Sequence, residues 1–478
     1  IAVELNVPDQ ALQKALAEFK GVGRRFQPYG DWPLPQGGRI TVVDDYGHHP
    51  SELAATLQTA RSLKSKRLIV FFQPHRYTRT QALADDFGKV LQAADVVFIT
   101  DVYAASEKPI KGISGQTLVD AMKVHGDIPA TYLPDLATAH HEIGHALQPG
   151  DLLITLGAGN VHEAGTRIAA DLKILEEMRA LMPPGEIDGK LYEPMSRHTT
   201  LLVGGPAQYW IEPHSFYGFA FLVDYCRERG IPVRVVGRGS NLLVRDGGIR
   251  GAVIHPTGGV FSEVTVDGRG HVTAGAGVRL KKLASVAGGS GIGGFEWMEG
   301  IPGNVGGALR MNAGAMGIET FDQVVRVTFL DEDGVIRTRE REEIVASYRN
   351  VAELRRNFAL QAVFKGKNDT PANIKERWDA SREKRKSSQP IAASAGCTFR
   401  NPEEVPAGRV IDSMGLKGTT CGHAAVSEVH GNFVVNQGGA TALEILTLIE
   451  FIQEKARTER SVELETEIKI LGDDEPSF

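Results

Sequence analysis

The stretch that decides the fold lies near the middle of the chain. It reads Gly300-Ile301-Pro302-Gly303-Asn304-Val305-Gly306-Gly307-Ala308 and is closed by Met311-Asn312-Ala313-Gly314-Ala315. So many glycines, with a proline among them, make a regular helix or strand costly here. Because glycine has no Cβ, backbone N–H groups in such a turn can approach a phosphate group or a flat ring.

Another glycine-rich turn, the first of the two in chain order, lies upstream and directly follows the apolar run 231–236. It reads Gly237-Arg238-Gly239-Ser240-Asn241-Leu242-Leu243. Two such turns in one domain predict a large anionic cofactor that is bound across two lobes. The alternative is a pair of tight turns that only connect strands, because short glycine motifs often occur without a ligand.

Length and composition indicate a multidomain enzyme. The chain has 478 residues, of which 42% are hydrophobic and 23% charged, values typical of globular proteins. A net charge of −6 gives no reason to expect nucleic acid or a polybasic membrane anchor. No apolar run has membrane-spanning length, and no signal peptide is recognisable. Three cysteines form neither a disulfide framework nor a metal-binding pattern, so we expect a cytoplasmic protein without a metal.

The first third of the chain alternates apolar runs with amphipathic stretches. The runs are 40–43, 68–72, 96–99 and 152–156, and the stretches between them include 51–64 and 81–93. Continuous apolar strands separated by helices indicate a parallel sheet that helices cover on both faces. We therefore expect a Rossmann-like α/β domain from about residue 40 to residue 160.

Polar residues gather directly after these runs, in segments 44–50, 73–80, 101–103 and 157–160. In open α/β sheets, ligands bind beyond the carboxyl ends of the strands, so these loops predict a ligand site. The segments contain, among other polar residues, Asp45, His48, His49, Arg76 and Arg79. For the two histidines, a surface turn that starts a helix is the alternative.

Five more short motifs follow in the rest of the chain. They are His198-Thr199-Thr200-Leu201-Leu202-Val203-Gly204-Gly205-Pro206-Ala207, Ser347-Tyr348-Arg349, Ala395-Gly396-Cys397-Thr398-Phe399-Arg400-Asn401-Pro402, Val426-Ser427-Glu428-Val429-His430-Gly431-Asn432-Phe433 and Leu464-Glu465-Thr466-Glu467. With the two glycine-rich turns, this ordered set resembles the UDP-N-acetylenolpyruvoylglucosamine reductase (MurB) family over roughly the last three hundred residues.

The resemblance implies a two-lobed α+β fold that binds FAD noncovalently, followed by an α+β substrate-binding domain. It also implies NADPH as the hydride donor and a UDP-sugar as the substrate, in peptidoglycan precursor synthesis. Carried over by motif, the cofactor residues are Gly237, Arg238, Gly239, Ser240, Asn241, Leu242, Gly300, Ile301, Pro302, Gly303, Asn304, Gly306, Gly307 and Ala308.

Three catalytic residues are implied by the same resemblance. Arg349 stands at the position of the arginine that stabilises an enolate, and Glu467 matches the second glutamate of its motif. Cys397 occupies the position of a proton-donating serine. A thiol has an ordinary pKa of about 8.5, so it stays largely protonated at neutral pH and can donate a proton.

The implied substrate-binding residues are Tyr348, Lys386, Asn401 and Asn432. Lys386 belongs to a basic cluster whose members are candidates for contacts with the uridine diphosphate: Arg382, Lys384, Arg385 and Lys386. For most of these four, a solvated face is the expected interpretation. The span from Arg349 to Cys397 is short, as in the shorter subtype of the family, which argues against a tyrosine lid. Farther on, Thr441-Ala442-Leu443-Glu444 predicts a capped helix to about residue 455, with a buried stripe of Leu443, Leu446, Ile449 and Ile452.

The first third resembles the C-terminal domain of UDP-N-acetylmuramate–L-alanine ligase, and segment 19–27 matches the start of that domain. This resemblance implies that the loop of Asp45, His48 and His49 faces a nucleotide. It implies that Arg76 and Arg79 face the carboxylate of the incoming amino acid, for which a guanidinium fork is suited.

No Gly-x-x-x-x-Gly-Lys-Ser/Thr phosphate loop occurs anywhere in the sequence, and the ligase family carries it in the preceding domains. We therefore expect a truncated ligase–reductase fusion whose ligase domain is inactive alone. Association with the missing ligase domains or with other cell-wall enzymes is then conceivable. The expected domains are a ligase domain at 1–168, a linker at 169–185, flavin lobes at 186–258 and 259–390, and a substrate domain at 391–478.

Two other functions remain open from the sequence. A flavin oxidase built on the same fold would react with dioxygen and ignore the enolpyruvyl sugar nucleotide. A scaffold that only binds sugar nucleotides would hold no flavin.

Overall fold

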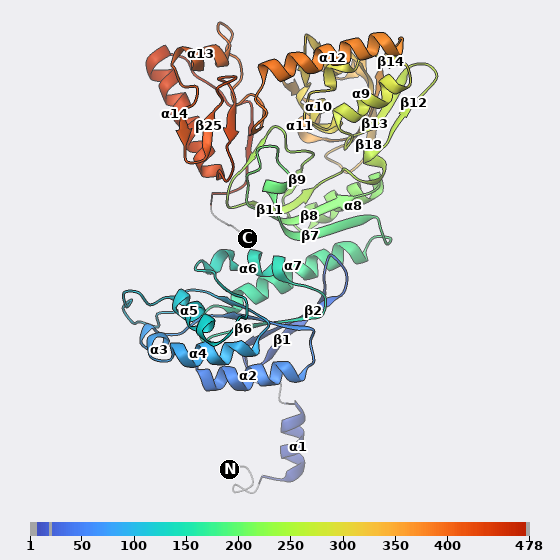
Figure 1. The fold of residues 1–478 in the computed structure, drawn as a ribbon. Helices are drawn as coiled ribbons and strands as arrows, with labels where there is room; N and C mark the ends of the chain where they lie inside the picture. Colours follow the sequence, from blue (N-terminus) through green and yellow to red (C-terminus); the bar gives the residue numbers. More distant parts are fainter. Residues whose placement is uncertain (1–6, 19–21, 475–478) are drawn as a thin grey trace. The chain divides into compact units, whose positions relative to one another are not determined.

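The computed structural model describes residues 7–18 and 22–474 and divides into two compact units, Ile1–Glu176 (unit 1) and Glu177–Phe478 (unit 2) (Figure 1). The division falls inside helix α7 (His162–Ala180), within the segment predicted as a linker. Residues 19–21, part of the ligase-like segment 19–27, lie outside the described residues.

Unit 1 is built on one six-stranded sheet with the order β1-β2-β6-β3-β4-β5. Its central strands are β2 (Arg39–Asp45), β6 (Asp151–Leu156), β3 (Arg67–Phe72) and β4 (Val96–Ile99). These four pair in parallel, in agreement with the apolar runs in the sequence. Both faces of the strands are buried, which explains why the runs are continuous rather than alternating.

The two edge strands were not predicted. β1 (Gln27–Pro33) pairs antiparallel with β2, and β5 (Ala130–Tyr132) pairs parallel with β4. β1 contains two prolines and a glycine, which an edge strand tolerates because one side of it needs no ladder hydrogen bonds. β5 has only three residues, too few for a recognisable pattern.

Helices connect the strands of unit 1, after the N-terminal helix α1 (Asp9–Glu18). They are α2 (Pro50–Ser62), α3 (Tyr77–Ala82), α4 (Ala84–Val90), α5 (Gly115–His125) and α6 (Leu136–Ala146). The predicted helix 81–93 is therefore part of a broken run of short helices. The core on one face of the sheet joins side chains of α2, α4 and α5 to alternate strand residues such as Val70 and Ile154.

Unit 2 begins with a four-stranded sheet of order β7-β8-β11-β9, covered by helix α8 (Phe216–Glu228) (Figure 1). The strands are β7 (Ile187–Pro194), β8 (Pro206–Pro213), β11 (Ile249–Ile254) and β9 (Val233–Val235). The C-terminal strand β27 (Lys469–Leu471) returns to pair in parallel with β10 (Leu242–Val244), at the end of the first glycine-rich turn.

A five-stranded antiparallel sheet follows, with the order β12-β13-β21-β17-β18. Its strands are β12 (Val264–Val266), β13 (His271–Gly275), β21 (Phe358–Lys365), β17 (Val324–Leu330) and β18 (Ile336–Glu340). Helices α9 (Leu280–Gly289), α10 (Val305–Met311) and α11 (Glu353–Arg356) and the long α12 (Pro371–Ser388) accompany it. The glycine-rich stretch 300–308 was expected to disfavour a helix, but its second half forms the start of α10. The helix is stable there because Val305, Ala308 and Leu309 are buried on its inner face.

The last part of unit 2 is a small sheet of order β23-β26-β25-β24 with two helices. The strands are β23 (Ala393–Ser394), β26 (Val434–Asn436), β25 (Ala424–Val426) and β24 (Thr420–Cys421), and the helices are α13 (Ala407–Ser413) and α14 (Ala442–Arg460). Short pairs complete the unit: β14 (Ile292–Gly293) with β22 (Lys367–Asn368), β15 (Gly314–Ala315) with β16 (Ile318–Glu319), and β19 (Ala346–Ser347) with β20 (Asn350–Val351).

The predicted capping box of α14 is present, because Thr441 and Glu444 cap each other. The predicted stripe is partly wrong. Leu446, Ile449 and Ile452 are buried, but Leu443 is 64% exposed. The first turn of the helix presents Ala442 to the core instead, so the buried face is rotated by one residue at this end.

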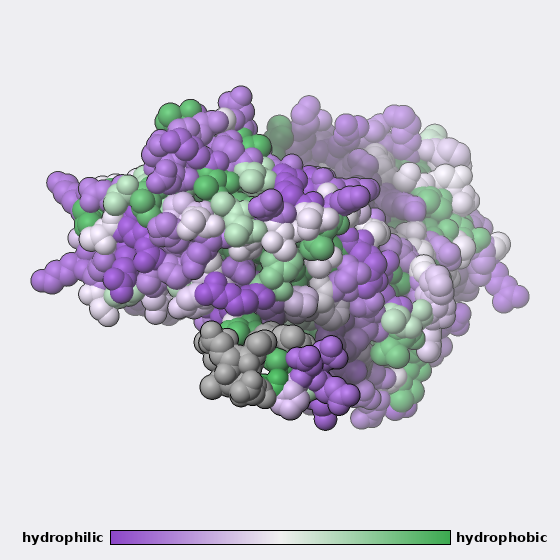
Figure 2. All heavy atoms as spheres, turned by 90° about the horizontal axis from the view of Figure 1, so that it is seen from below, coloured by the Kyte–Doolittle hydropathy of each residue, from purple (hydrophilic) through white to green (hydrophobic). Residues whose placement is uncertain are grey.

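The face in Figure 2 is mainly hydrophilic, with hydrophobic residues in small scattered groups. Within residues 7–18 and 22–474, none of the helices combines the length and the apolar character needed to cross a membrane.

Candidate active site

The two glycine-rich turns lie against each other in unit 2. A Cβ placed on Gly237 would lie 2.9 Å from Oδ1 of Asn304, and one on Gly303 would lie 3.5 Å from Oγ of Ser240. Gly239 has a φ of 62°, and a side chain there would overlap the carbonyl oxygen of His198. The motif 198–207 therefore packs against the turn 237–243. This motif and the two glycine-rich turns are separate in sequence but adjacent in the structure.

A cavity of about 980 Å³ opens beside these turns, large enough for a dinucleotide. Gly237, Arg238 and Asn304 line it, together with His198 and its neighbours. The lining includes five cationic side chains: Arg197, Arg238, Arg279, Lys281 and Lys282. None of the lining residues carries a carboxylate. Burial and the charge of Arg279 lower the pKa of Arg238, so these cations crowd one another.

Asn304 supplies a second sign of a ligand. Its side-chain nitrogen donates to the carbonyl of Gly277, while its Oδ1 is buried without a hydrogen-bond partner. Buried polar atoms are usually paired, so an unpaired acceptor at a cavity wall indicates a missing donor. The cationic lining and this free acceptor fit FAD, which carries a diphosphate and a ring with hydrogen-bond donors.

The predicted catalytic residues come together although they are far apart in sequence. Glu467 N donates to the carbonyl of Thr398 at 2.8 Å, which places Glu467 beside the turn that carries Cys397. Arg349 Nε donates to Glu467 Oε1 at 2.6 Å. Asn241 of the first glycine-rich turn donates to the carbonyl of Glu467 at 3.3 Å. One glutamate thus joins the arginine, the turn that carries Cys397 and the glycine-rich turn 237–243.

Arg349 sits in a strained turn between β19 and β20, with a φ of 54°. Its guanidinium also lies 4.9 Å from the ring centre of Tyr348. Burial works against the charge of Arg349, but Glu467 outweighs it and raises the pKa of the guanidinium. The side chain therefore stays a cation beside the thiol.

Cys397 is a half-buried free thiol. Burial, aided by the nearby Glu467, raises its pKa to about 11, although Arg349 and Arg385 act in the opposite direction. The group is therefore a protonated thiol throughout the neutral range, as a proton donor requires.

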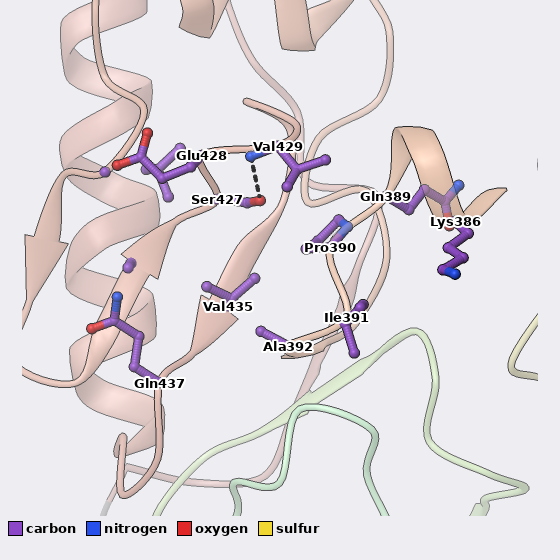
Figure 3. Close-up of a pocket in the computed structure, with 13 residues that line it drawn as sticks. Lys386, Gln389, Pro390, Ile391, Ala392, Ser427, Glu428, Val429, Val435 and Gln437 are labelled. Carbon is purple, nitrogen blue, oxygen red and sulfur yellow. Dashed lines mark hydrogen bonds between the residues drawn. The ribbon is translucent and has the colours of Figure 1, made fainter. Parts of the chain in front are cut away.

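Lys386 and Tyr348, two of the predicted substrate residues, are both exposed. Lys386 stands at the end of α12 and lines a separate cavity of about 410 Å³ (Figure 3). Ile391 and Ala392 line that cavity on one side, and Glu428 and Gln437 lie on the other side in this view.

Asn401 and Asn432 differ in their surroundings. Asn401 is exposed, and its Oδ1 accepts from Ala407 N at 3.1 Å. Asn432 is buried, and its amide bonds to both backbone groups of Phe399, at 2.8 Å each. Asn432 therefore holds the thiol turn in place.

Sequence reasoning gave no role to Asn312, and it treated Arg385 only as one of four basic residues that were candidates for contacts with the uridine diphosphate. The Nδ2 group of Asn312 donates to Glu319 at 2.6 Å and to the carbonyl of Ser347 at 3.3 Å, which links the glycine-rich segment to the turn of Arg349. Arg385 packs directly on Gly300. The signal for Asn312 was its place in the closing motif, whereas Arg385 was hidden in a run of exposed charges.

In unit 1, the polar loops meet at the carboxyl ends of the strands. Asp45 is buried and accepts from Phe26 N and Gly47 N at 2.8 Å each, so it organises its own loop. His49 caps α2. The ring of His48 lies 5.1 Å from the ring of His75, which sequence reasoning had not selected.

Arg76 and Arg79 flank the same histidine pair. Arg76 is held in a positive-φ conformation, with its N–H donating to the carbonyl of Tyr103 at 2.9 Å. Nη1 of Arg79 and Nδ1 of His75 are buried without a hydrogen-bond partner. Burial and the nearby His48, Arg79 and Arg76 lower the pKa of His75. This cluster of basic groups with unused donors suits an anion.

Three family models match separate parts of the chain. Residues 24–159 match the Mur ligase, glutamate ligase domain, and residues 207–339 match an FAD binding domain. Residues 388–471 match the C-terminal domain of UDP-N-acetylenolpyruvoylglucosamine reductase. Unit 2 is therefore a flavin-binding protein, joined to a domain of the Mur ligase type.

Similar proteins specify the family. The UDP-N-acetylenolpyruvoylglucosamine reductase of Bacillus pumilus is 39% identical over 285 residues, which are 59% of this chain and 93% of that protein. The protein of that name from Heliobacterium modesticaldum is 42% identical and is covered to 90%. The crystal structure of the reductase from Thermus caldophilus superposes with a TM-score of 0.52 at 35% identity, covering 60% of this chain and 99% of that one. The chain belongs to the UDP-N-acetylenolpyruvoylglucosamine reductase family.

Proposed function

We propose that this chain reduces UDP-N-acetylglucosamine enolpyruvate to UDP-N-acetylmuramate, with FAD as cofactor and NADPH as the hydride donor. The observation that carries the proposal is the cluster of Arg349, Glu467 and Cys397 beside the flavin turns. An enol ether next to a carboxylate needs a hydride at one carbon, a proton at the other, and stabilisation of the charge between the two steps.

FAD, when bound, supplies the hydride for the vinyl carbon distal to the carboxylate. The turns at Gly237 and Gly303 and the cations of the large cavity hold the cofactor. Arg349, kept charged by Glu467, faces the negative charge that develops on the adjacent carbon and on the carboxylate. Cys397 gives its Sγ proton to that carbon and recovers a proton from solvent afterwards.

Several residues serve this centre by position. Asn312 and Asn432 fix the turns of Arg349 and Cys397. We assign Tyr348, Lys386 and Asn401 to the sugar nucleotide, because all three are accessible and come from segments that flank the cluster.

For unit 1 we propose a retained anion site made of His48, His75, Arg76 and Arg79, in which Asp45 and His49 have structural roles. The carboxylate of an amino acid is the expected ligand. ATP-dependent ligation is not part of the proposed activity, because the sequence contains no phosphate loop.

The test is NADPH oxidation by the purified, FAD-loaded chain with and without UDP-N-acetylglucosamine enolpyruvate. Substrate-dependent oxidation and formation of UDP-N-acetylmuramate are expected. Oxidation that depends on dioxygen and ignores the sugar nucleotide would instead identify an oxidase. If the purified chain binds no flavin, the remaining hypothesis is a non-enzymatic scaffold that only binds sugar nucleotides.

A further inference from the structure

One basic residue of α12 points inward. Arg382, Lys384 and Lys386 are exposed, as expected of a solvated face, but Arg385 is half-buried. Its side chain lies on Gly300, the first residue of the flavin segment. A Cβ on Gly300 would overlap Cδ and Nε of Arg385. Because no positive φ requires glycine at this position, the contact with Arg385 is the structural reason for it.

The charge of Arg385 is not matched by a carboxylate. Its Nη2 donates to the neutral amide of Gln389 at 2.8 Å. Among the described residues, no aspartate or glutamate lies within 4.0 Å of it. Arg349 differs, because Glu467 pairs with it at 2.6 Å. The other nearby carboxylate, Glu299, pairs with Lys281 at 3.0 Å. A half-buried cation without a carboxylate partner is stabilised when a ligand supplies the anion.

The position of Arg385 indicates which anion of the substrate it binds, the carboxylate or the diphosphate. The side chain touches the flavin segment at Gly300, and its charge opposes the rise that burial causes in the pKa of the Cys397 thiol. Arg385 thus contacts the segment that is proposed to bind the flavin, and its charge acts on the thiol that is proposed to give the proton. In the proposed reaction the reacting carbons lie near both groups, whereas the diphosphate of the substrate extends away from these carbons.

We propose that Arg385 binds the carboxylate of the enolpyruvyl group and so orients the double bond between the flavin and Cys397. The inference rests on the proposed function. As hydride adds to the distal carbon, the π electron pair moves toward the adjacent carbon and the carboxylate, which Arg385 and Arg349 stabilise together. The thiol proton then forms the second C–H bond.

The experiment compares two ligands on FAD-loaded protein: UDP-N-acetylglucosamine enolpyruvate, and UDP-N-acetylglucosamine, which lacks the carboxylate. Calorimetry measures both affinities for the wild type, Arg385→Met, Arg385→Lys and Gly300→Ala. Arg385→Met should weaken binding of the enolpyruvyl ligand about 10–100-fold, the usual effect of losing a charge-assisted hydrogen bond. Its affinity for UDP-N-acetylglucosamine should stay within about twofold, and Arg385→Lys should recover part of the loss.

Gly300→Ala should reproduce the loss of Arg385→Met, because the new methyl group displaces the guanidinium. Two controls are matched to these variants. Arg382→Met removes an exposed charge from the same helix, and Gly289→Ala adds a methyl group in open space at the end of α9. Both should behave as wild type. Flavin content and thermal unfolding of each variant show whether it is folded.

If Arg385→Met weakens the binding of both ligands equally, Arg385 binds the diphosphate that the two ligands share, and the proposal is overturned. A changed FAD affinity or flavin midpoint potential with unchanged discrimination between the ligands would make it a cofactor residue, which also overturns it. Unchanged binding of both ligands would refute any role in the site. If the wild type fails to oxidise NADPH with the enolpyruvyl substrate, the proposed function fails, whatever the variants do.

Discussion

Replacing Cys397 with alanine removes the proposed proton donor. The change should leave reduction of the bound flavin by NADPH intact, because that step needs no acid from the protein. Reoxidation by UDP-N-acetylglucosamine enolpyruvate should slow by about 10²–10⁴-fold, the usual contribution of a positioned acid. Cys397→Ser should retain part of the rate, because a hydroxyl can occupy the same position and donate a proton.

The environment of the Cys397 thiol also predicts how slowly it reacts with an alkylating reagent. Because its pKa is raised to about 11, Cys397 is on the order of 10²-fold less ionised at pH 8 than an ordinary thiol with a pKa of about 8.5. Alkylation by iodoacetamide should therefore be about 10²-fold slower than that of a free cysteine. The raised pKa also means that the donor is competent below about pH 11, so reoxidation should not fall between pH 7 and pH 9 through loss of this proton.

Stopped-flow absorbance of the flavin follows both half-reactions separately. Cys421→Ala is the matched control, because Cys421 is also a half-buried free thiol but lies in β24, outside the proposed site. Equal slowing of both half-reactions in Cys397→Ala would mean that the residue shapes the flavin site. Unchanged reoxidation would show that the proton comes from another group, and rapid alkylation at pH 8 would contradict the raised pKa.

Four further outcomes follow from the same structure. All flavin should be released when the protein is denatured with acid, and a yellow precipitate would contradict noncovalent binding. The purified chain should not ligate L-alanine to UDP-N-acetylmuramate with ATP, and phosphate release that depends on both substrates would overturn this. Arg67→Met should lower the free energy of unfolding of unit 1 by roughly 3 kcal/mol in a thermal melt, because it removes both bonds from Arg67 and leaves the buried carboxylate of Asp151 with only the bond from Gln148 N. Asn432→Asp should cost about 1–3 kcal/mol, because a carboxylate oxygen would face the carbonyl of Phe399; an unchanged melting temperature would contradict this role.

Local patterns predicted much of unit 1. The bounds of β4 are those of its apolar run, and β2, β3 and β6 begin only one residue earlier than theirs. This works because strands buried on both faces must be apolar at every position. The edge strand β1 was not predicted, because an edge strand tolerates proline and does not need a continuous apolar pattern.

Motifs also selected Arg349, Cys397 and Glu467 as candidates, because the proposed chemistry calls for those residue types. Their distances could not be predicted. Glu467 reaches Arg349, 118 positions earlier, only because the last strand returns to pair with β10. The partners of a charge depend on such long-range packing, which no local pattern records.

The sequence by itself determined the two domain types, and it supplied the two glycine-rich turns and the candidate catalytic residues, because each depends on particular residues at particular places in the chain. Only the tertiary structure decided which side chains face one another. In the structure, Leu443 is exposed to solvent, and Asn432 is hydrogen-bonded to the turn that carries Cys397. Arg385 packs on Gly300, whereas its basic neighbours in the sequence are exposed. The physical reason is that burial and pairing are properties of the packed molecule, set by contacts between segments that lie far apart in the chain.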